Sequence, residues 1–208
     1  MRWHGILYIL QFSFWCLAYL FALLRGWRDK TYSIPLPAIL LNVAWELLAC
    51  TVYRQYLPVA PVMAITWLLL DLCILFQVFL YSPNEFPGIN RFVFASLILN
   101  GLLLCIYVFH LAHAAGLTYL LSAFPQNLLM SILFVRMLKV RRSLRGQSFY
   151  IAIFKFLGTL CAMLFVLLNF LSPLYETTFA AIIFFDLIYL NLVWSHLQRA
   201  GANPWLLW

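Results

Sequence analysis

Apolar residues form long runs in this sequence, and short polar or proline-containing segments separate them. Each run has roughly the 20 residues with which a helix crosses the ~30 Å hydrocarbon core of a bilayer. The runs lie at 5–24, 35–53, 61–81, 92–112, 117–138, 149–171 and 175–197. The pattern predicts an all-α integral membrane protein, a single bundle of seven transmembrane helices formed by residues 1–208.

Composition supports a membrane location. Hydrophobic residues make up 66% of the chain and charged residues only 9%, which exceeds what the core of a water-soluble domain requires. The first run is too long for the apolar region of a signal peptide, and no small-x-small cleavage site follows it. We therefore expect it to be the first spanning helix. The five cysteines all lie inside apolar runs, where a thiol behaves as a small apolar group, so no disulfide framework is implied.

The net charge is +7. We attribute it to basic residues in cytoplasmic loops, which set the orientation of a membrane protein, and not to nucleic-acid binding. With seven helices, only Arg2 and Arg54 fall on one side. The basic residues on the other side are Arg25, Arg28, Lys30, Arg91, Lys139, Arg141, Arg142, Arg145 and Arg199. This asymmetry predicts an N-terminus outside and a C-terminus in the cytoplasm. The run from Lys139 to Arg145 is expected to anchor the protein to anionic lipid.

Three carboxyl side chains, those of Glu46, Asp71 and Asp186, lie near the middle of apolar runs. A charged group at mid-membrane costs roughly 2.5–3.5 kcal/mol on insertion scales, so such residues turn inward and are seldom present without a partner or a function. Other polar or amphipathic side chains occur at similar depth in five of the runs. They are Asn42, Trp45, Trp67, Gln126, Asn127, Ser131, Lys155, Thr159 and Tyr189. This shared depth predicts one interior site.

Some of these polar residues need not be functional, because hydrogen bonds that hold neighbouring helices together would account for their presence equally well. Each such bond contributes about 0.6–2 kcal/mol, and Asn42, Gln126, Asn127, Ser131 and Thr159 suit that role. Hydrogen bonding between helices accounts less well for Glu46 and Asp186, because the side-chain amide of Asn or Gln could make the same bonds with a smaller free-energy cost of burial. Asp71 could neutralise Lys155 or hydrogen-bond Trp67. Lys155 itself lies close enough to a helix end for its ammonium group to reach the interface.

The chemistry of such a site follows from burial and from its aromatic surroundings. Burial favours the protonated form of an unpaired carboxyl group, and two neighbouring carboxyls can share a proton as acid and base. Phe, Tyr and Trp make up 18% of the chain, and aromatic faces attract cations. This combination suits carbocation chemistry. His110 and His113 are three residues apart but lack further ligands, so we expect neither a metal nor a cofactor.

Five sequence segments, in this order, resemble a known family, the small seven-helix integral-membrane terpene cyclases of fungal meroterpenoid and indole-diterpene pathways and their actinobacterial relatives. The segments are Asn42-Val43-Ala44-Trp45-Glu46, Trp67-Leu68-Leu69-Leu70-Asp71, Gln126-Asn127-Leu128-Leu129-Met130-Ser131, Lys155-Phe156-Leu157-Gly158-Thr159 and Asp186-Leu187-Ile188-Tyr189. The resemblance implies that Glu46 and Asp186 are catalytic. We expect one of them to protonate the substrate, while the other hydrogen-bonds to this acid and poises it. The residues that we expect to orient these acids, bind the polar end of the substrate or line the path of the cation are Asn42, Trp45, Trp67, Asp71, Gln126, Asn127, Lys155 and Tyr189.

The resemblance also implies the reaction. Such enzymes protonate a terminal epoxide or alkene of a prenylated aromatic substrate and direct the cyclisation of the resulting cation, without Mg²⁺. In agreement, neither a DDxxD nor a DxDD motif occurs in the sequence. The short loops and compact length favour a bacterial plasma-membrane cyclase of a prenylated indole-type substrate; a fungal protein would lie in the endoplasmic reticulum.

Two other functional classes also use buried polar residues in membranes. A proton-coupled small-molecule transporter or channel requires midplane carboxylates, but it also requires a polar route to both faces. The polar residues here cluster at one level. A receptor or chaperone-like subunit would keep a cavity without requiring acids.

Overall fold

The computed structural model describes residues 2–52, 60–117, 119–169 and 173–203. Its regular structure in this part of the chain is entirely α-helical, as predicted. The seven helices are α1 (Arg2–Asp29), α2 (Leu36–Thr51), α3 (Ala60–Glu85), α4 (Arg91–Ala114), α5 (Tyr119–Arg141), α6 (Phe149–Asn169) and α7 (Pro173–Arg199). The all-α membrane fold is therefore confirmed, with several helices extending beyond their predicted ends.

Helices α1 and α3 extend furthest beyond prediction. The predicted end of α1 at residue 24 is wrong, because the helix continues through Gly26 to Asp29 and ends where Lys30 adopts a left-handed conformation, with φ of 50°. The predicted end of α3 at residue 81 is also wrong. Proline removes a backbone N–H, but α3 continues past Pro83, and the Ser82 hydroxyl donates to the Phe79 carbonyl at 3.1 Å. That carbonyl is the one that Pro83 leaves without its helical donor.

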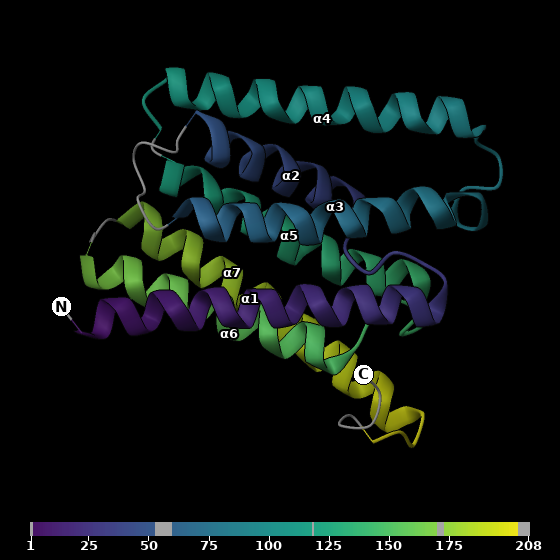
Figure 1. Ribbon diagram of the computed structural model, residues 1–208. Helices are drawn as coiled ribbons and strands as arrows, with labels where there is room; N and C mark the ends of the chain where they lie inside the picture. Colours follow the sequence, from purple (N-terminus) through teal and green to yellow (C-terminus); the bar gives the residue numbers. More distant parts are fainter. Residues whose placement is uncertain (1, 53–59, 118, 170–172, 204–208) are drawn as a thin grey trace.

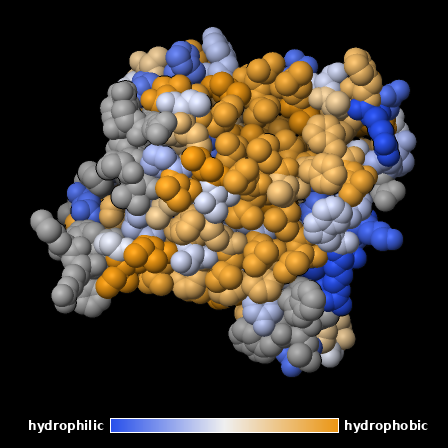
Figure 2. Space-filling model, viewed as in Figure 1, coloured by the Kyte–Doolittle hydropathy of each residue, from blue (hydrophilic) through white to orange (hydrophobic). Residues whose placement is uncertain are grey.

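Among the described residues, five helices are long and apolar enough to cross a membrane, namely α1, α3, α4, α6 and α7. Helix α2 is apolar but has only 16 residues, about 24 Å at 1.5 Å per residue. Helix α5 has a lower mean hydropathy because it carries several polar and basic residues. Hydrophobic residues cover the middle of one face of the molecule, and hydrophilic residues gather at its right-hand edge (Figure 2).

Six of the helices form a closed ring in the order α1, α3, α2, α5, α7, α6, since each contacts the next and α6 returns to α1. Helix α4 lies outside this ring, against α2, at the top of Figure 1. Within the ring, α1 is thus the neighbour of both α3 and α6, whereas α5 lies between α2 and α7. This arrangement decides which polar side chains can meet in the interior.

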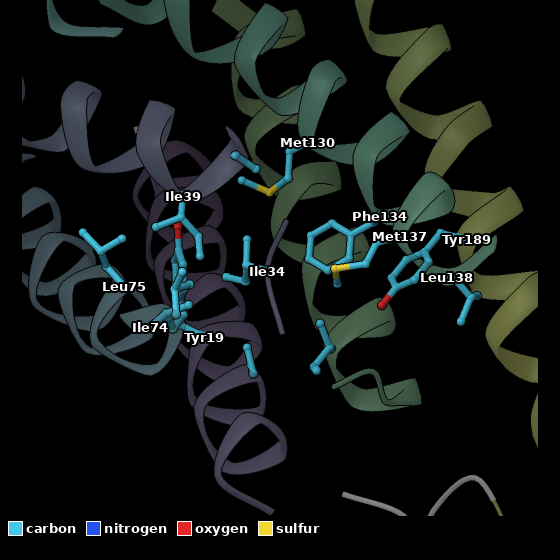
Figure 3. Close-up of a cluster of buried hydrophobic side chains, with 14 of the residues drawn as sticks. Tyr19, Ile34, Ile39, Ile74, Leu75, Met130, Phe134, Met137, Leu138 and Tyr189 are labelled. Carbon is cyan, nitrogen blue, oxygen red and sulfur yellow. The ribbon is translucent and has the colours of Figure 1, made fainter. Parts of the chain in front are cut away.

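The hydrophobic core fills the ring toward the end where α1 and α5 finish. Tyr19, Ile39 and Ile74 lie together on one side of Ile34, while Phe134, Met137 and Tyr189 lie on the other (Figure 3). The residues of this core come from all seven helices, with Phe94 and Ile98 contributed by α4, and from the segment between α1 and α2.

A set of ion pairs and hydrogen bonds, here called the basic-end clasp, closes the same end of the bundle. Glu85, at the end of α3, lies 3.0 Å from Arg145 and 3.4 Å from Arg141, and accepts a hydrogen bond from Thr31 at 2.6 Å. Arg141 also donates to the Tyr32 carbonyl at 2.9 Å. Arg141 and Arg145 therefore bind the protein's own loops, which corrects the prediction that the whole run from Lys139 to Arg145 contacts lipid. Arg54 lies outside the described residues, and the predicted orientation across the membrane stays a prediction.

Replacing Glu85 by glutamine should weaken the clasp and lower the stability of the protein. The carboxylate holds two arginines and is only 11% exposed, and hydrogen bonds to charged groups contribute about 1.5–3 kcal/mol each. We expect the thermal midpoint of the detergent-solubilised Glu85→Gln variant to fall. Glu176 is exposed at the start of α7, so Glu176→Gln should leave the midpoint unchanged. Equal midpoints for the two variants would contradict the clasp.

Candidate functional site

A hydrogen-bonded chain crosses the interior from α5 to α3, here called the Tyr19 network. The Gln126 amide on α5 donates to the side-chain oxygen of Asn42 on α2. The Asn42 amide donates to the hydroxyl of Tyr19 on α1 at 2.8 Å, and that hydroxyl donates to Asp71 on α3 at 3.2 Å. Every donor points toward Asp71, so its Oδ2 atom is the final acceptor of the network.

Asp71 is completely buried, and its partner in this structure is Tyr19. Neither of the two predicted partners is found. Lys155 pairs with a different carboxylate, and the Trp67 indole N–H makes no hydrogen bond among the described residues. The second oxygen of Asp71, Oδ1, is also buried without a hydrogen-bond partner in this part of the chain. It remains available to a substrate or to another proton carrier.

Glu46 lies one turn from Asn42 on α2 and is 2% exposed. Its Oε2 atom has no hydrogen-bond partner, and the carboxyl has no cationic partner, among the described residues. Asp71 is the acidic group that interacts electrostatically with it. Two buried carboxyls that repel each other do not both ionise readily. The two carboxyls differ in their surroundings, because Asp71 accepts a hydrogen bond from Tyr19 whereas Glu46 Oε2 has no partner among the described residues.

Asp186 and Lys155 form an ion pair deep in the bundle. The Lys155 Nζ atom lies 2.6 Å from Asp186 Oδ1 and 2.8 Å from the Ser131 hydroxyl, and the two side chains are each 2% exposed. The prediction that Lys155 reaches the interface is therefore wrong. Helix α6 lies between α1 and α7 in the ring, so the lysine points inward to a carboxylate on α7.

Helix α1 lies between the two carboxyl sites and contributes aromatic side chains to both. The Trp15 ring centre is 5.9 Å from Lys155 Nζ and 5.9 Å from the Tyr19 ring centre. Trp15 also packs on Gly158 of α6, where an added Cβ would lie 2.7 Å from its ring. A small cavity borders Trp15, Tyr19 and Lys155. It is lined by Trp15, Ala18, Tyr19, Ile34, Met130, Phe134, Ile151 and Lys155.

The remaining predicted residues bind neighbours near these two sites. Asn127 donates to Thr159 at 3.1 Å, and Trp45 donates to Ser122 at 3.2 Å. The Trp67 ring packs on Phe12 at 5.8 Å. Asn127 and Trp67 thus contact other helices of the ring, whereas Trp45 packs in the cluster of Ala44, Leu48 and Phe109 between α2 and α4.

Tyr189 is directed away from the carboxyl sites. Its hydroxyl donates to Gln147, and Gln147 in turn donates to the Ser33 carbonyl at 2.8 Å. Its ring lies 5.0 Å from that of Phe134. Tyr189 thus helps to close the basic end of the bundle and has no hydrogen bond to Asp186 among the described residues.

Two residues of the site, Tyr19 and Trp15, were missed by the sequence analysis. Both lie in an aromatic-rich apolar run, where a tyrosine or tryptophan is more often a packing residue. Their spacing of four residues places them on one face of a helix, but the same run contains other aromatic residues at helical spacing. The sequence alone does not distinguish this face from the others.

Chemically, the interior combines one buried carboxyl that has no partner in the described part of the chain, that of Glu46, with two carboxyl groups that accept hydrogen bonds, those of Asp71 and Asp186. A neutral carboxylic acid in a dry, aromatic environment can donate a proton, and the carboxylates can stabilise positive charge. Among the described residues, no three His, Cys, Asp or Glu side chains come close enough together to hold a metal ion.

Comparison with known proteins reveals several relatives. Terpene cyclase andB of Emericella variicolor is 29% identical over 157 residues, which cover 72% of this chain and 66% of that protein. Asnovolin H synthase nvfL of Aspergillus novofumigatus is 28% identical over 158 residues, 70% of this chain and 62% of that protein. Terpene cyclase nodB of Hypoxylon pulicicidum is 24% identical over 202 residues, with coverages of 87% and 81%.

The chain spans a little under two thirds of the length of andB and of terpene cyclase macJ of Penicillium terrestre, 66% and 60% respectively. No solved structure matches it. The sequence profile of the Pyr4-like transmembrane terpene cyclases, however, matches residues 2–199, nearly the whole chain. This protein therefore belongs to the Pyr4-like transmembrane terpene cyclase family.

Proposed function

We propose that this protein is a membrane-bound terpene cyclase that protonates a terminal epoxide or alkene of a prenylated aromatic substrate and directs the cyclisation of the resulting carbocation. The observation that carries the proposal is the Glu46 carboxyl, which is buried and has no cationic partner among the described residues. Family membership and the names of the relatives as terpene cyclases support the reaction class.

Glu46 is the proton donor in this proposal. We do not assign Asp186 the role of a second acid that poises Glu46, because its carboxyl is paired with Lys155. Its carboxylate offsets the lysine charge, which would otherwise repel a carbocation in the same interior. Trp15, Tyr19 and Phe134 line a water-sized cavity beside Lys155. In this proposal the substrate widens that cavity when it binds, and the three aromatic rings then stabilise the positive charge on the prenyl chain.

The reaction is balanced without a cofactor. The O–H bond of Glu46 breaks as a bond from its proton to the epoxide oxygen or the terminal alkene carbon forms. The prenyl double bonds then attack the cation in turn, and the last cation loses a proton. The product is an isomer of the substrate, because the proton gained at the start equals the proton lost at the end.

Incubating membranes that contain the protein with farnesylated and geranylgeranylated aromatics, with and without a terminal epoxide, tests the proposal. We expect a product of unchanged mass with fewer double bonds, formed in the presence of EDTA. In D₂O, alkene protonation leaves a deuterium on carbon, whereas epoxide protonation leaves only an exchangeable one on oxygen. Membranes from cells without the protein are the control.

Two outcomes would overturn this function. If no isomeric product forms from any of these substrates, the protein is not an acid-initiated cyclase of prenylated aromatics. If proteoliposomes instead move a substrate across the bilayer with its skeleton unchanged, and that flux depends on a proton gradient, the transporter alternative replaces it.

A further inference from the structure

We propose that Asp71 is a second catalytic carboxyl, which takes the proton that the last carbocation releases and returns it to Glu46. This inference rests on the proposed cyclase function and adds to it the route by which the acid is restored. It assigns the acid and the base to neighbouring helices, α2 and α3.

The direction of the hydrogen bonds in the Tyr19 network is the first argument. Asp71 Oδ2 accepts the Tyr19 hydroxyl, which itself receives a hydrogen bond from Asn42, and Asn42 receives one from Gln126. A carboxylate that accepts such bonds stays charged more readily than one that does not. The network therefore holds Asp71 ready to receive a proton.

The oxygen atoms left without partners are the second argument. Asp71 Oδ1 and Glu46 Oε2 are both buried without a hydrogen-bond partner among the described residues. Buried polar atoms are nearly always hydrogen-bonded, so such free acceptor atoms indicate a place where a proton or a ligand group is exchanged. Asp186 Oδ2 also lacks a partner in this part of the chain, but Glu46 is the carboxyl linked to Asp71, because Asn42 lies one turn from Glu46 and donates to the Tyr19 hydroxyl that binds Asp71.

The Lys155–Asp186 pair is the third argument, because it leaves Asp186 less suited to the same task. One Asp186 oxygen is bound to the Lys155 ammonium at 2.6 Å, and Lys155 also donates to Ser131. A carboxylate that is fixed by a cation is a weaker base than one that is held by a neutral tyrosine. Asp71 has no cationic partner among the described residues.

The proposed cycle conserves protons. Glu46 gives its proton to the substrate and becomes a carboxylate. The final carbocation loses a C–H or O–H proton, and a new O–H bond forms at Asp71. This proton then passes to the Glu46 carboxylate, so the enzyme returns to neutral Glu46 and charged Asp71. No oxidant, reductant or metal takes part.

The test compares the first turnover with later ones in purified Asp71→Asn protein. Glu46 can still deliver its one proton, so we expect substrate to be consumed in the first turnover at close to the wild-type rate, but the last carbocation then lacks its base and the normal deprotonated product should not form. Steady-state turnover should then fall by at least about 100-fold, since general acid–base groups contribute roughly 10²- to 10⁴-fold. Tyr19→Phe should keep the first turnover and slow later turnovers less than Asp71→Asn does. Rapid quenching followed by mass spectrometry measures both phases.

Asp71→Glu should recover part of the steady-state rate, because it restores a base, and Glu176→Gln should behave as wild type in both phases. A merely structural role for Asp71 would slow the consumption of substrate in the first turnover as much as the formation of product, and that result would overturn the proposal. Wild-type turnover in Asp71→Asn would overturn it as well. In both cases cyclisation by the wild-type protein would still support the proposed function, so the two failures are distinguishable.

Discussion

Replacing Glu46 by glutamine should abolish cyclisation while leaving the protein folded. Glutamine has nearly the same shape as glutamic acid but no proton acidic enough to start a carbocation. The expected loss in rate is at least about 100-fold, the lower end of what a positioned general acid contributes. Because Glu46 Oε2 has no hydrogen-bond partner and the carboxyl no ion pair among the described residues, the substitution removes no contact that stabilises the fold.

The measurement is the initial rate of product formation at matched protein concentration, together with the thermal midpoint of each variant. Glu176→Gln makes the same chemical change at an exposed position and should retain the wild-type rate. Glu46→Asp keeps an acid but shortens the side chain by one methylene, so it should be slow yet active. If Glu46→Gln cyclises the substrate at the wild-type rate, another group supplies the proton.

The sequence predicts the helices well because their lengths follow from the bilayer. Runs of apolar residues mark the spans, and the polar loops between them separate neighbouring helices. The ends are less predictable. Pro83 and Gly26 are usual helix breakers, yet α3 and α1 continue through them. Gly26 is explained by tertiary packing and does not mark a helix end, because a Cβ at this position would lie 2.4 Å from the Gln77 side chain of α3.

The sequence also gives the depth of the polar residues but not their partners. Glu46, Asp71 and Asp186 are all buried, in agreement with their positions at mid-run. Which of them meets Lys155 depends on the order of helices around the ring, where α6 is next to α7 and α3 is next to α1. That order is set by packing between helices distant in sequence. For the same reason, Tyr19 could not be recognised as the partner of Asp71.

Replacing Lys155 by methionine should produce the largest loss of stability among the variants considered. Methionine fills a similar volume but leaves the Asp186 carboxylate buried without its cation. Removing one partner of a buried ion pair destabilises a protein by about 3–5 kcal/mol. We expect a markedly lower thermal midpoint for Lys155→Met, and a similar fall for Asp186→Asn, which leaves the ammonium without its carboxylate. Lys139→Met, at an exposed position of α5, is the matched control and should change the midpoint little.

The double variant Lys155→Met/Asp186→Asn separates stability from catalysis. It leaves no unpaired charge at this site, so it should be more stable than either single variant, and comparison of the four midpoints measures the coupling. If Asp186 also stabilises the carbocation, the double variant will fold but lose most of its cyclisation rate. If it folds and cyclises at the wild-type rate, the ion pair contributes only to structure, and the aromatic side chains around Trp15 must carry the electrostatic stabilisation alone.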